Sequence, residues 1–398
     1  DVSGGSMGIY IIGNGGSITS TGAVDGDTFG ITIFGSGSVT STGAVTSNLY
    51  GIYIGGNGNV TSTGDLDAGY VAIYVYGNGD ITSTGNIDAL DSGIYLYGAG
   101  NITSTGDINS GYVGIFHDWN GNITSIGNID AFDTGIYLYG DGTIRSTGNI
   151  DAGYIGIQHD GNGDIFSMGD INAYGLGCGC GGDSAGIYLY GDGNITSDGN
   201  ITSTFSGIEG GDGAQQVDVS GSISAPLAVL LGEGDDSLVI RRFTVINGDV
   251  EMEDGDDVVV VENYAQVNGM MYGGEGAEVN GDTLIIGSGQ VCSEDEAAVL
   301  EFGDSLDGLD PDAGMVTYLG QTYTWAEFER LGREGFIAPC VGKINDGRIN
   351  AYDLGAPEAL YCTVENGVSV WELDLEGQGT FSFAVSKAQI EAAFAAAV

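Results

Sequence analysis

Residues 93–112, GIYLYGAGNITSTGDINSGY, decide the fold, because residues 135–154, GIYLYGDGTIRSTGNIDAGY, repeat them almost unchanged. The underlying period is half of that 42-residue interval, since GI(Y) units recur along the chain mostly at steps of 21 residues. The first step is 22 residues, and one step of 30 residues carries the insertion YGLGCGCGG. Self-similarity at a fixed period is the signature of a solenoid. The isoleucines that mark the units are Ile9, Ile31, Ile52, Ile73, Ile94, Ile115, Ile136, Ile157, Ile187 and Ile208.

Each unit contains three short segments, such as GIYLYG, NITSTG and NIDA, separated by Gly, Asn and Asp. Short segments with β-branched centres are typical of strands, and Gly, Asn and Asp are typical of the corners between them. Three strands per 21 residues predict an all-β fold, a three-sided parallel β-helix whose coils stack about 4.8 Å apart. The sequence resembles parallel β-helix repeat proteins of the bacterial secreted or cell-surface type.

Alternation along each strand predicts which side chains face the core. Ile94 and Leu96 point inward, whereas Tyr95 and Tyr97 point outward. His117 and His159 fall in the inward column, where a core role is expected. Stacking turns each outward position into a ladder. The tyrosine ladder, a candidate interaction surface, consists of Tyr53, Tyr74, Tyr95, Tyr137 and Tyr188. Acidic ladders are predicted at Asp65, Asp107 and Asp170, and at Asp67, Asp88, Asp130 and Asp151.

The repeat predicts three regions. The regular solenoid spans 1–225. A degenerate continuation spans 226–290, where GEGDDSLVI and EDGDDVVVV again lie 21 residues apart. In 291–398 prolines, tryptophans and most basic residues appear, and the stretches 324–336 and 386–397 have helical spacing. A small α+β C-terminal domain, with a capping or assembly role, is therefore expected there.

Composition excludes some partners. The formal net charge is −47, and only eight residues are Lys or Arg. So negative a chain repels nucleic acid and anionic membranes, so neither is expected as a partner. No apolar run reaches the ~18 residues that a spanning helix needs, so membrane insertion is not expected either. The first residue is Asp1, without Met or a signal segment, which we interpret as a processed chain, secreted or on the cell surface. A truncated chain would look the same.

Two stretches resemble calcium sites. GEGDDSLVI resembles one copy of the nonapeptide of Ca²⁺-binding β-rolls, which implies ligands at Asp235, Asp236, Asp256 and Asp257. The β-roll repeats every nine residues, whereas these copies are 21 apart, so a simple Gly/Asp corner is the alternative interpretation.

KINDGRINAYD (343–353) resembles the second half of a dockerin or EF-hand loop, which implies Ca²⁺ ligands at Asp346, Asn350 and Asp353. Gly342 and Ile344 stand where the first acidic ligands of that loop belong. The wider tail resembles C-terminal segments of secreted proteins from filamentous Chloroflexota-type bacteria, which implies a cell-surface location.

The five cysteines suggest disulfides in an exported chain. Cys340 and Cys362 bracket the GRINAYD stretch and form the first expected pair. Cys178 and Cys180 lie on the inserted loop, where they close a small ring or offer one thiol elsewhere. Cys292 pairs with that loop or stays free, and the odd count leaves a thiol able to cross-link chains.

Catalysis is not expected. The scaffold resembles β-helices that degrade polysaccharides, which need a carboxylate cluster or Ca²⁺ beside a basic residue. The regular coils offer Arg145 alone, and no nucleophile or phosphate-loop motif occurs. The preferred hypothesis is a structural subunit that joins head to tail into a filament, sheath or surface layer, because the chain starts directly in coil one without a cap. The alternative is a monomeric adhesin that binds glycans.

Overall fold

The computed structural model describes residues 1–175, 184–262, 265–269 and 271–273, and beyond these only the backbone of strands between residues 283 and 384. Every described secondary-structure element is a β-strand. None of the described residues forms a helix with the length and apolar character needed to cross a membrane. The chain divides into unit 1, Asp1–Gly193 with Asp198–Phe205, and unit 2, Asn194–Ser197 with Ser206–Val398.

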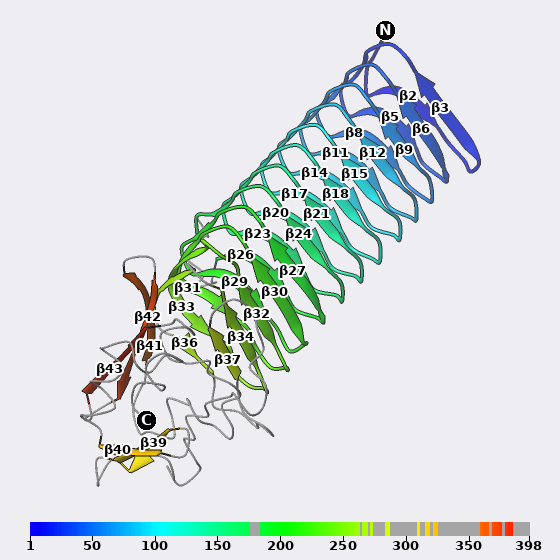
Figure 1. Cartoon of the computed structure of the whole chain (residues 1–398). Helices are drawn as coiled ribbons and strands as arrows, with labels where there is room; N and C mark the ends of the chain where they lie inside the picture. The colour runs from blue at the N-terminus through cyan, green and yellow to red at the C-terminus, as the bar shows by residue number, and fades with distance from the viewer. Residues whose placement is uncertain are drawn as a thin grey trace. The chain divides into compact units, whose positions relative to one another are not determined.

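Unit 1 is a parallel β-solenoid with three strands in each coil (Figure 1), which confirms the predicted fold class. The first face is made by β2 (Met7–Ile11), β5 (Phe29–Ile33), β8 (Tyr50–Ile54), β11 (Val71–Val75), β14 (Ser92–Leu96), β17 (Val113–His117), β20 (Thr134–Leu138), β23 (Ile155–His159) and β26 (Ala185–Leu189). The second face is made by β3 (Gly16–Ser20), β6 (Gly37–Ser41), β9 (Val60–Ser62), β12 (Ile81–Ser83), β15 (Ile102–Ser104), β18 (Ile123–Ser125), β21 (Ile144–Ser146) and β24 (Ile165–Ser167). The third face is made by β1 (Val2–Gly4), β4 (Val24–Gly26), β7 (Val45–Ser47), β10 (Leu66–Ala68), β13 (Ile87–Ala89), β16 (Ile108–Ser110), β19 (Ile129–Ala131), β22 (Ile150–Ala152), β25 (Ile171–Ala173) and β28 (Ile201–Ser203).

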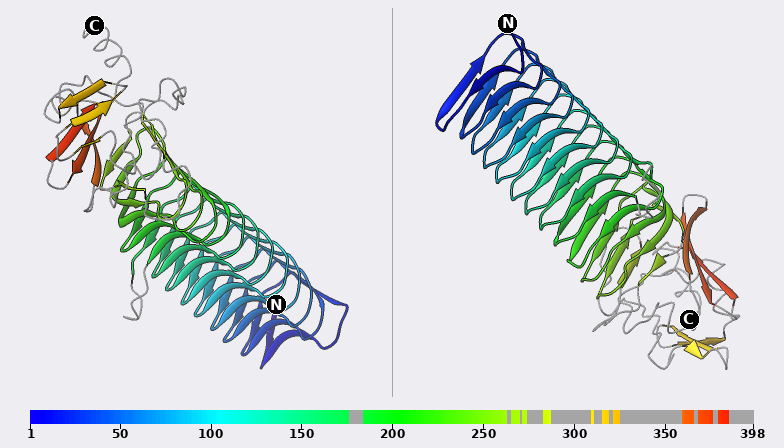
Figure 2. Two further views of the ribbon diagram at one scale, coloured as in Figure 1. Left: turned by 90° about the horizontal axis from the view of Figure 1, so that it is seen from below. Right: turned by 180° about the vertical axis from the view of Figure 1, so that it is seen from behind.

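Each strand of unit 1 pairs in parallel with the equivalent strand one coil away, so identical positions lie directly above one another (Figure 2). On the first face Ile73 is opposite Ile94, and on the third face Ile87 is opposite Ile108. The strands are therefore paired with the same 21-residue spacing that the sequence repeat shows.

The core is the column of side chains that alternation predicts. Ile94 and Leu96 are fully buried, and the small inward Ser104 is buried in register between Ser83 and Ser125 of the second face. His117 and His159 are also fully buried, and His117 lies in register between Leu96 and Leu138. Both histidines therefore occupy core positions.

The corner between the second and third faces requires glycine. A Cβ atom on Gly106 would lie 2.2 Å from the carbonyl oxygen of Gly85, one coil earlier. The same clash with backbone recurs at Gly127 and Gly148. Successive coils thus approach too closely at this corner for any side chain, which explains the invariant final letter of the TSTG segment.

Unit 2 contains further parallel strands. They are β27 (Gly193–Ser197), β29 (Ser206–Gly210), β30 (Gln215–Val219), β31 (Ile223–Leu230), β32 (Ser237–Ile240), β33 (Val245–Glu251), β34 (Val258–Val261), β35 (Gln266–Asn268), β36 (Met271–Tyr272) and β37 (Thr283–Ile286). Strands β30, β32, β34 and β37 pair in parallel in that order, and β31 pairs with β33 through shifts in register. Solenoid-type pairing thus reaches Ile286 in the stretch predicted as a degenerate continuation.

The described strands after residue 300 pair in antiparallel fashion instead. One set is β38 (Leu309–Asp310), β39 (Met315–Tyr318) and β40 (Gln321–Thr324), and the other is β41 (Ala359–Glu365), β42 (Val368–Leu375) and β43 (Gly379–Ala384). Apart from Thr324, the last residue of β40, the stretches predicted as helices lie outside the described residues.

Candidate functional site

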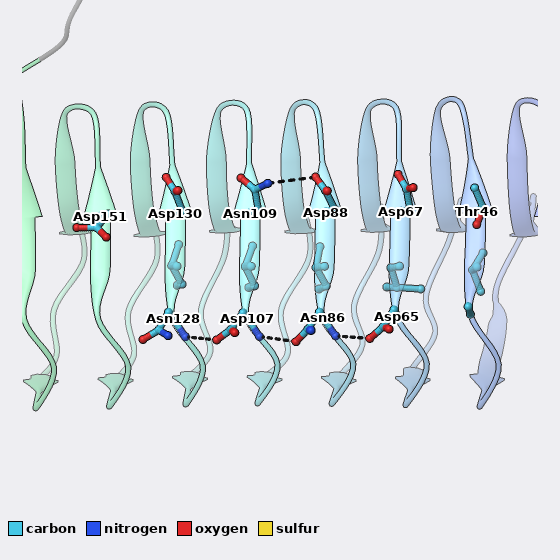
Figure 3. A pocket seen from close by; sticks show the side chains of 16 residues that line it. Thr46, Asp65, Asp67, Asn86, Asp88, Asp107, Asn109, Asn128, Asp130 and Asp151 are labelled. Carbon is cyan, nitrogen blue, oxygen red and sulfur yellow. Dashed lines mark hydrogen bonds between the residues drawn. The ribbon is translucent and has the colours of Figure 1, made fainter.

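A shallow acidic groove runs along the third face of unit 1 (Figure 3). Two parallel rows of side chains border it, because positions two apart on one strand point to the same side. The inner row consists of Asp65, Asn86, Asp107 and Asn128, and the outer row of Thr46, Asp67, Asp88, Asn109, Asp130 and Asp151.

The inner row is held in place by the backbone. Oδ1 of Asp65 accepts the backbone N–H of Asn86 at 2.9 Å, and Oδ1 of Asn86 accepts that of Asp107 at 3.1 Å. The same bond continues rung by rung through Asn149 and Asp170 to Asn200. Asp and Asn interchange freely here because both supply the acceptor oxygen that the next coil requires.

Both rows are exposed except at the half-buried Asp151, but the outer row differs in its pairing. Asp67 lies in register with Asp88, and Asp130 with Asp151, so carboxylates occupy adjacent rungs about 4.8 Å apart. Asn109 breaks the series and donates from Nδ2 to Oδ1 of Asp88 at 3.4 Å. Like charges at this distance repel by roughly 1 kcal/mol in water. A cation that approaches the groove therefore lowers the electrostatic free energy of these carboxylates.

The groove offers oxygen atoms only, which are the ligands that hard cations such as Ca²⁺ prefer. However, within the described ranges no three His, Cys, Asp or Glu side chains come together closely enough to hold a metal ion. The geometry suits a spread cloud of cations, or basic groups on a partner, better than one fixed ion.

The first face carries the predicted tyrosine ladder, and its rings stack. The centroids of Tyr74 and Tyr95 are 5.0 Å apart with planes inclined by 24°, and those of Tyr53 and Tyr74 are 5.5 Å apart. Phe116 continues the stack from Tyr95 at 4.6 Å, while Gln158 interrupts the ladder between Tyr137 and Tyr188. All five predicted tyrosines are half-buried, and the stacked rings of the neighbouring rungs cover those of Tyr74 and Tyr95.

A second aromatic row, which the sequence analysis did not single out, is more exposed. It follows two residues after the first row and comprises Tyr76, Tyr97, Tyr139 and Tyr190. Tyr76 and Tyr97 are 51% and 39% exposed, and their rings are stacked in almost parallel planes, with centroids 4.9 Å apart. The second outward letter of GIYLYG was the signal that could have identified this row.

One ladder tyrosine is tied to an acid. The hydroxyl of Tyr137 donates to Oδ2 of Asp160 at 2.5 Å. Burial, followed by this hydrogen bond, raises the pKa of the Tyr137 hydroxyl above its ordinary value, so the phenol stays protonated as a donor.

The second face is neutral and regular over its first five coils. Each coil presents two outward threonines around one buried serine, as in Thr103, Ser104 and Thr105. The registers Thr61–Thr82 and Thr82–Thr103 align these hydroxyls in columns. The three faces of unit 1 thus differ in chemistry: one is aromatic, one carries hydroxyls and one is acidic.

In unit 2 the predicted calcium ligands divide between two environments. Asp235 is exposed, whereas Asp236 and Asp257 are buried. Oδ1 of Asp236 accepts the backbone N–H of Gln215 at 2.6 Å, and Oδ1 of Asp257 accepts that of Asp236 at 2.8 Å. Burial raises the pKa of Asp236 to about 7. Asp256 donates its backbone N–H to Oδ1 of Asp235 at 3.1 Å. Calcium binding here stays a prediction.

The remaining predicted site residues, apart from Cys362, lie outside the part of the chain that the structure describes. They are Asp346, Asn350 and Asp353, and the cysteines Cys178, Cys180, Cys292 and Cys340. Cys362 belongs to β41, where its backbone is opposite Trp371 of β42.

Comparison of the chain with family models, curated proteins and solved structures finds no match in any of the three.

Proposed function

We propose that this chain is a non-catalytic structural subunit of the cell exterior, which associates with copies of itself into a filament, sheath or surface layer. The observation that carries the proposal is the repetition of the first face of unit 1, where aromatic side chains stand on rung after rung. Exposed aromatic rings are the side chains that contribute most to protein interfaces.

Repetition strengthens such an interface. A contact that is weak at one rung recurs at the next with the same geometry, because the coils share one register. Linked weak contacts bind far more tightly than any one of them alone. The exposed row that contains Tyr76 and Tyr97 supplies contacts of this kind.

Charge sets the condition for assembly. Copies that each carry a formal charge of −47 repel one another, and the effect is strongest at low ionic strength. Cations that collect in the acidic groove relieve this repulsion, so divalent cations such as Ca²⁺ are expected to promote assembly.

A second candidate is glycan binding by a monomeric adhesin. The exposed, stacked pair Tyr76 and Tyr97 favours it, because exposed aromatic side chains offer apolar surface to the face of a sugar ring. Asn and Asp side chains at the adjacent corner, such as Asn78, supply hydrogen-bonding groups. In this case the protein would stay monomeric and retain polysaccharide on an affinity matrix.

Negative-stain electron microscopy of the purified full-length chain, with Ca²⁺ and with a chelator, tests the proposal. Filaments, bundles or sheets are the expected result. Filaments one solenoid wide would indicate end-to-end joining, and bundles would indicate side-by-side association. Isolated particles at high protein concentration in both solutions would overturn the proposal in favour of the adhesin.

A further inference from the structure

The second face of unit 1 changes character in its later coils. The paired threonines give way to Ile126 after β18, to Arg145 on β21, and to Phe166 and Met168 on and after β24. Ile126 and Met168 are 50% and 61% exposed. Large apolar side chains at such exposure, gathered on a flat sheet face, are typical of an interaction surface. We call these four residues the Arg145 patch.

Arg145 is the only Lys or Arg in the first 240 residues. It lies in register with Phe166 one coil away, and its guanidinium carbon is 3.9 Å from the centroid of that ring. Among the residues that the structure describes, the ion pairs are those of Arg241 in unit 2, and none involves Arg145. Arg145, the one Lys or Arg side chain of unit 1, is therefore presented outward without an ion-pair partner in the described part of the chain.

Stacking on the Phe166 ring orients the Arg145 guanidinium for contact with a partner. A ring beneath its face attracts the cation and restricts its motion, yet leaves the N–H donors at its edge available. Those donors can form two parallel hydrogen bonds to the oxygens of one carboxylate, in a bidentate geometry. Arginine and aromatic residues surrounded by apolar neighbours that exclude water are also characteristic of interface hot spots.

We propose that the Arg145 patch docks on the third face of a second copy of this chain, with the guanidinium against the adjacent carboxylates of Asp67 and Asp88. The proposal rests on the proposed function, since it names the contact through which copies associate. Charge complementarity carries it: Asp67 and Asp88 place carboxylates on neighbouring rungs of the third face, and a guanidinium beside them relieves their mutual repulsion.

The contact is directional. Each copy presents both the patch and the acidic groove, on different faces of the same unit. A contact between two different surfaces leaves one of each free in every pair, so a third and a fourth copy can add. Docking of this kind therefore generates an extended assembly rather than a closed dimer.

The test compares full-length variants by sedimentation velocity and electron microscopy over a range of protein concentrations, in the Ca²⁺-containing solution in which assembly is expected. Arg145→Glu is expected to raise the concentration at which assembly begins by at least tenfold. The matched control, Thr21→Glu with Thr63→Glu, lowers the net charge by the same two units on the same face away from the patch, and a change below threefold is expected. Because these positions are exposed, circular dichroism should show all variants folded.

A charge exchange identifies the partner surface. Asp67→Arg alone is expected to impair assembly as Arg145→Glu does, and the variant that combines both is expected to restore it. Assembly that Arg145→Glu leaves unchanged would overturn the patch while the proposed function stands. Impairment without rescue by Asp67→Arg would overturn the assignment to Asp67 and Asp88. A wild-type chain that never assembles would overturn the proposed function itself.

Discussion

Oδ1 of Asp107 accepts the backbone N–H of Asn128 at 2.8 Å, one coil further along the chain. Asp107 in turn donates its own backbone N–H to Asn86 in the preceding coil. The acidic ladder of the third face is thus a continuous hydrogen-bonded seam that joins each coil to the next. Its role in the fold depends on an acceptor oxygen and not on negative charge.

Replacing Asp107 should separate these two properties. Asp107→Ala leaves the N–H of Asn128 without its acceptor, and should lower the free energy of unfolding by about 1 kcal/mol. Asp107→Asn keeps the oxygen and should cost less than half of that. Urea unfolding followed by circular dichroism measures both. An equal loss in the two variants would show that charge, not hydrogen bonding, matters at this corner.

The glycine corner predicts a larger effect. The added Cβ of Gly106→Ala would lie 2.2 Å from the carbonyl oxygen of Gly85, so two coils must move apart. We expect a loss of at least 2 kcal/mol in the free energy of unfolding, within the range of overpacked cores. Gly5→Ala is the control, since a Cβ there meets nothing within 4 Å. Indistinguishable thermal unfolding of the two variants would contradict the close approach of coils at this corner.

The fold was predictable from the sequence because period and alternation are local properties that the stacked register preserves. Ile94 and Leu96 are buried as alternation requires, and the inward serines and histidines follow the same rule. The function of the Asp/Asn ladder was not predictable in this way. The sequence predicts only that acidic side chains stack in rows, whereas the direction of each side chain along the solenoid axis makes it a backbone acceptor.

The surfaces were predictable in part. Outward tyrosines were expected, but sequence alone does not say that Tyr95 is covered by its neighbours while Tyr97, beyond the end of β14, stays more exposed. The contact between Arg145 and Phe166 could have been found, since the two positions are one period apart. Isolated departures from a repeat are thus informative about function, because the repeat already accounts for the fold.

His117 should give the fold a measurable dependence on pH. Burial lowers the pKa of its imidazole to about 4 from an ordinary value near 6.5, despite a hydrogen-bond contact between Nε2 and the carbonyl oxygen of Gly98. The unfolded chain therefore binds the proton more readily, so stability is lost as pH falls from 6.5 to 4. The difference in pKa corresponds to about 3 kcal/mol at most.

His117→Leu is the suitable variant, because leucine stands at the same position one coil before and one coil after. The difference in unfolding free energy between wild type and variant should be constant above pH 7. Below pH 6.5 the unfolding free energy of the wild type should fall relative to that of the variant. Urea titrations at several pH values measure it. A difference that stays constant down to pH 4 would show that the imidazole takes up its proton without penalty.

Asp236 in unit 2 should give a pH dependence of the opposite sign, with stability lost as pH rises. Burial raises the pKa of its carboxyl group to about 7, well above its ordinary value of 3.8, and the nearby Asp235 adds to the effect. Between these two values the folded chain binds more protons than the unfolded chain. The stability that the protonated carboxyl supports is therefore complete below pH 4 and is lost as pH rises through 7, by up to about 4 kcal/mol.

Asp236→Asn tests this prediction, because the amide keeps an oxygen for the N–H of Gln215 and cannot ionise. Hydrogen exchange of peptides from β30 and β32 should show protection that declines from pH 5 to pH 8 in the wild type, after correction for intrinsic exchange rates, and stays level in the variant. Asp235→Asn, which changes the exposed neighbour, should keep most of the wild-type decline. If the wild type and Asp236→Asn decline in parallel, the buried carboxyl is not the group that titrates.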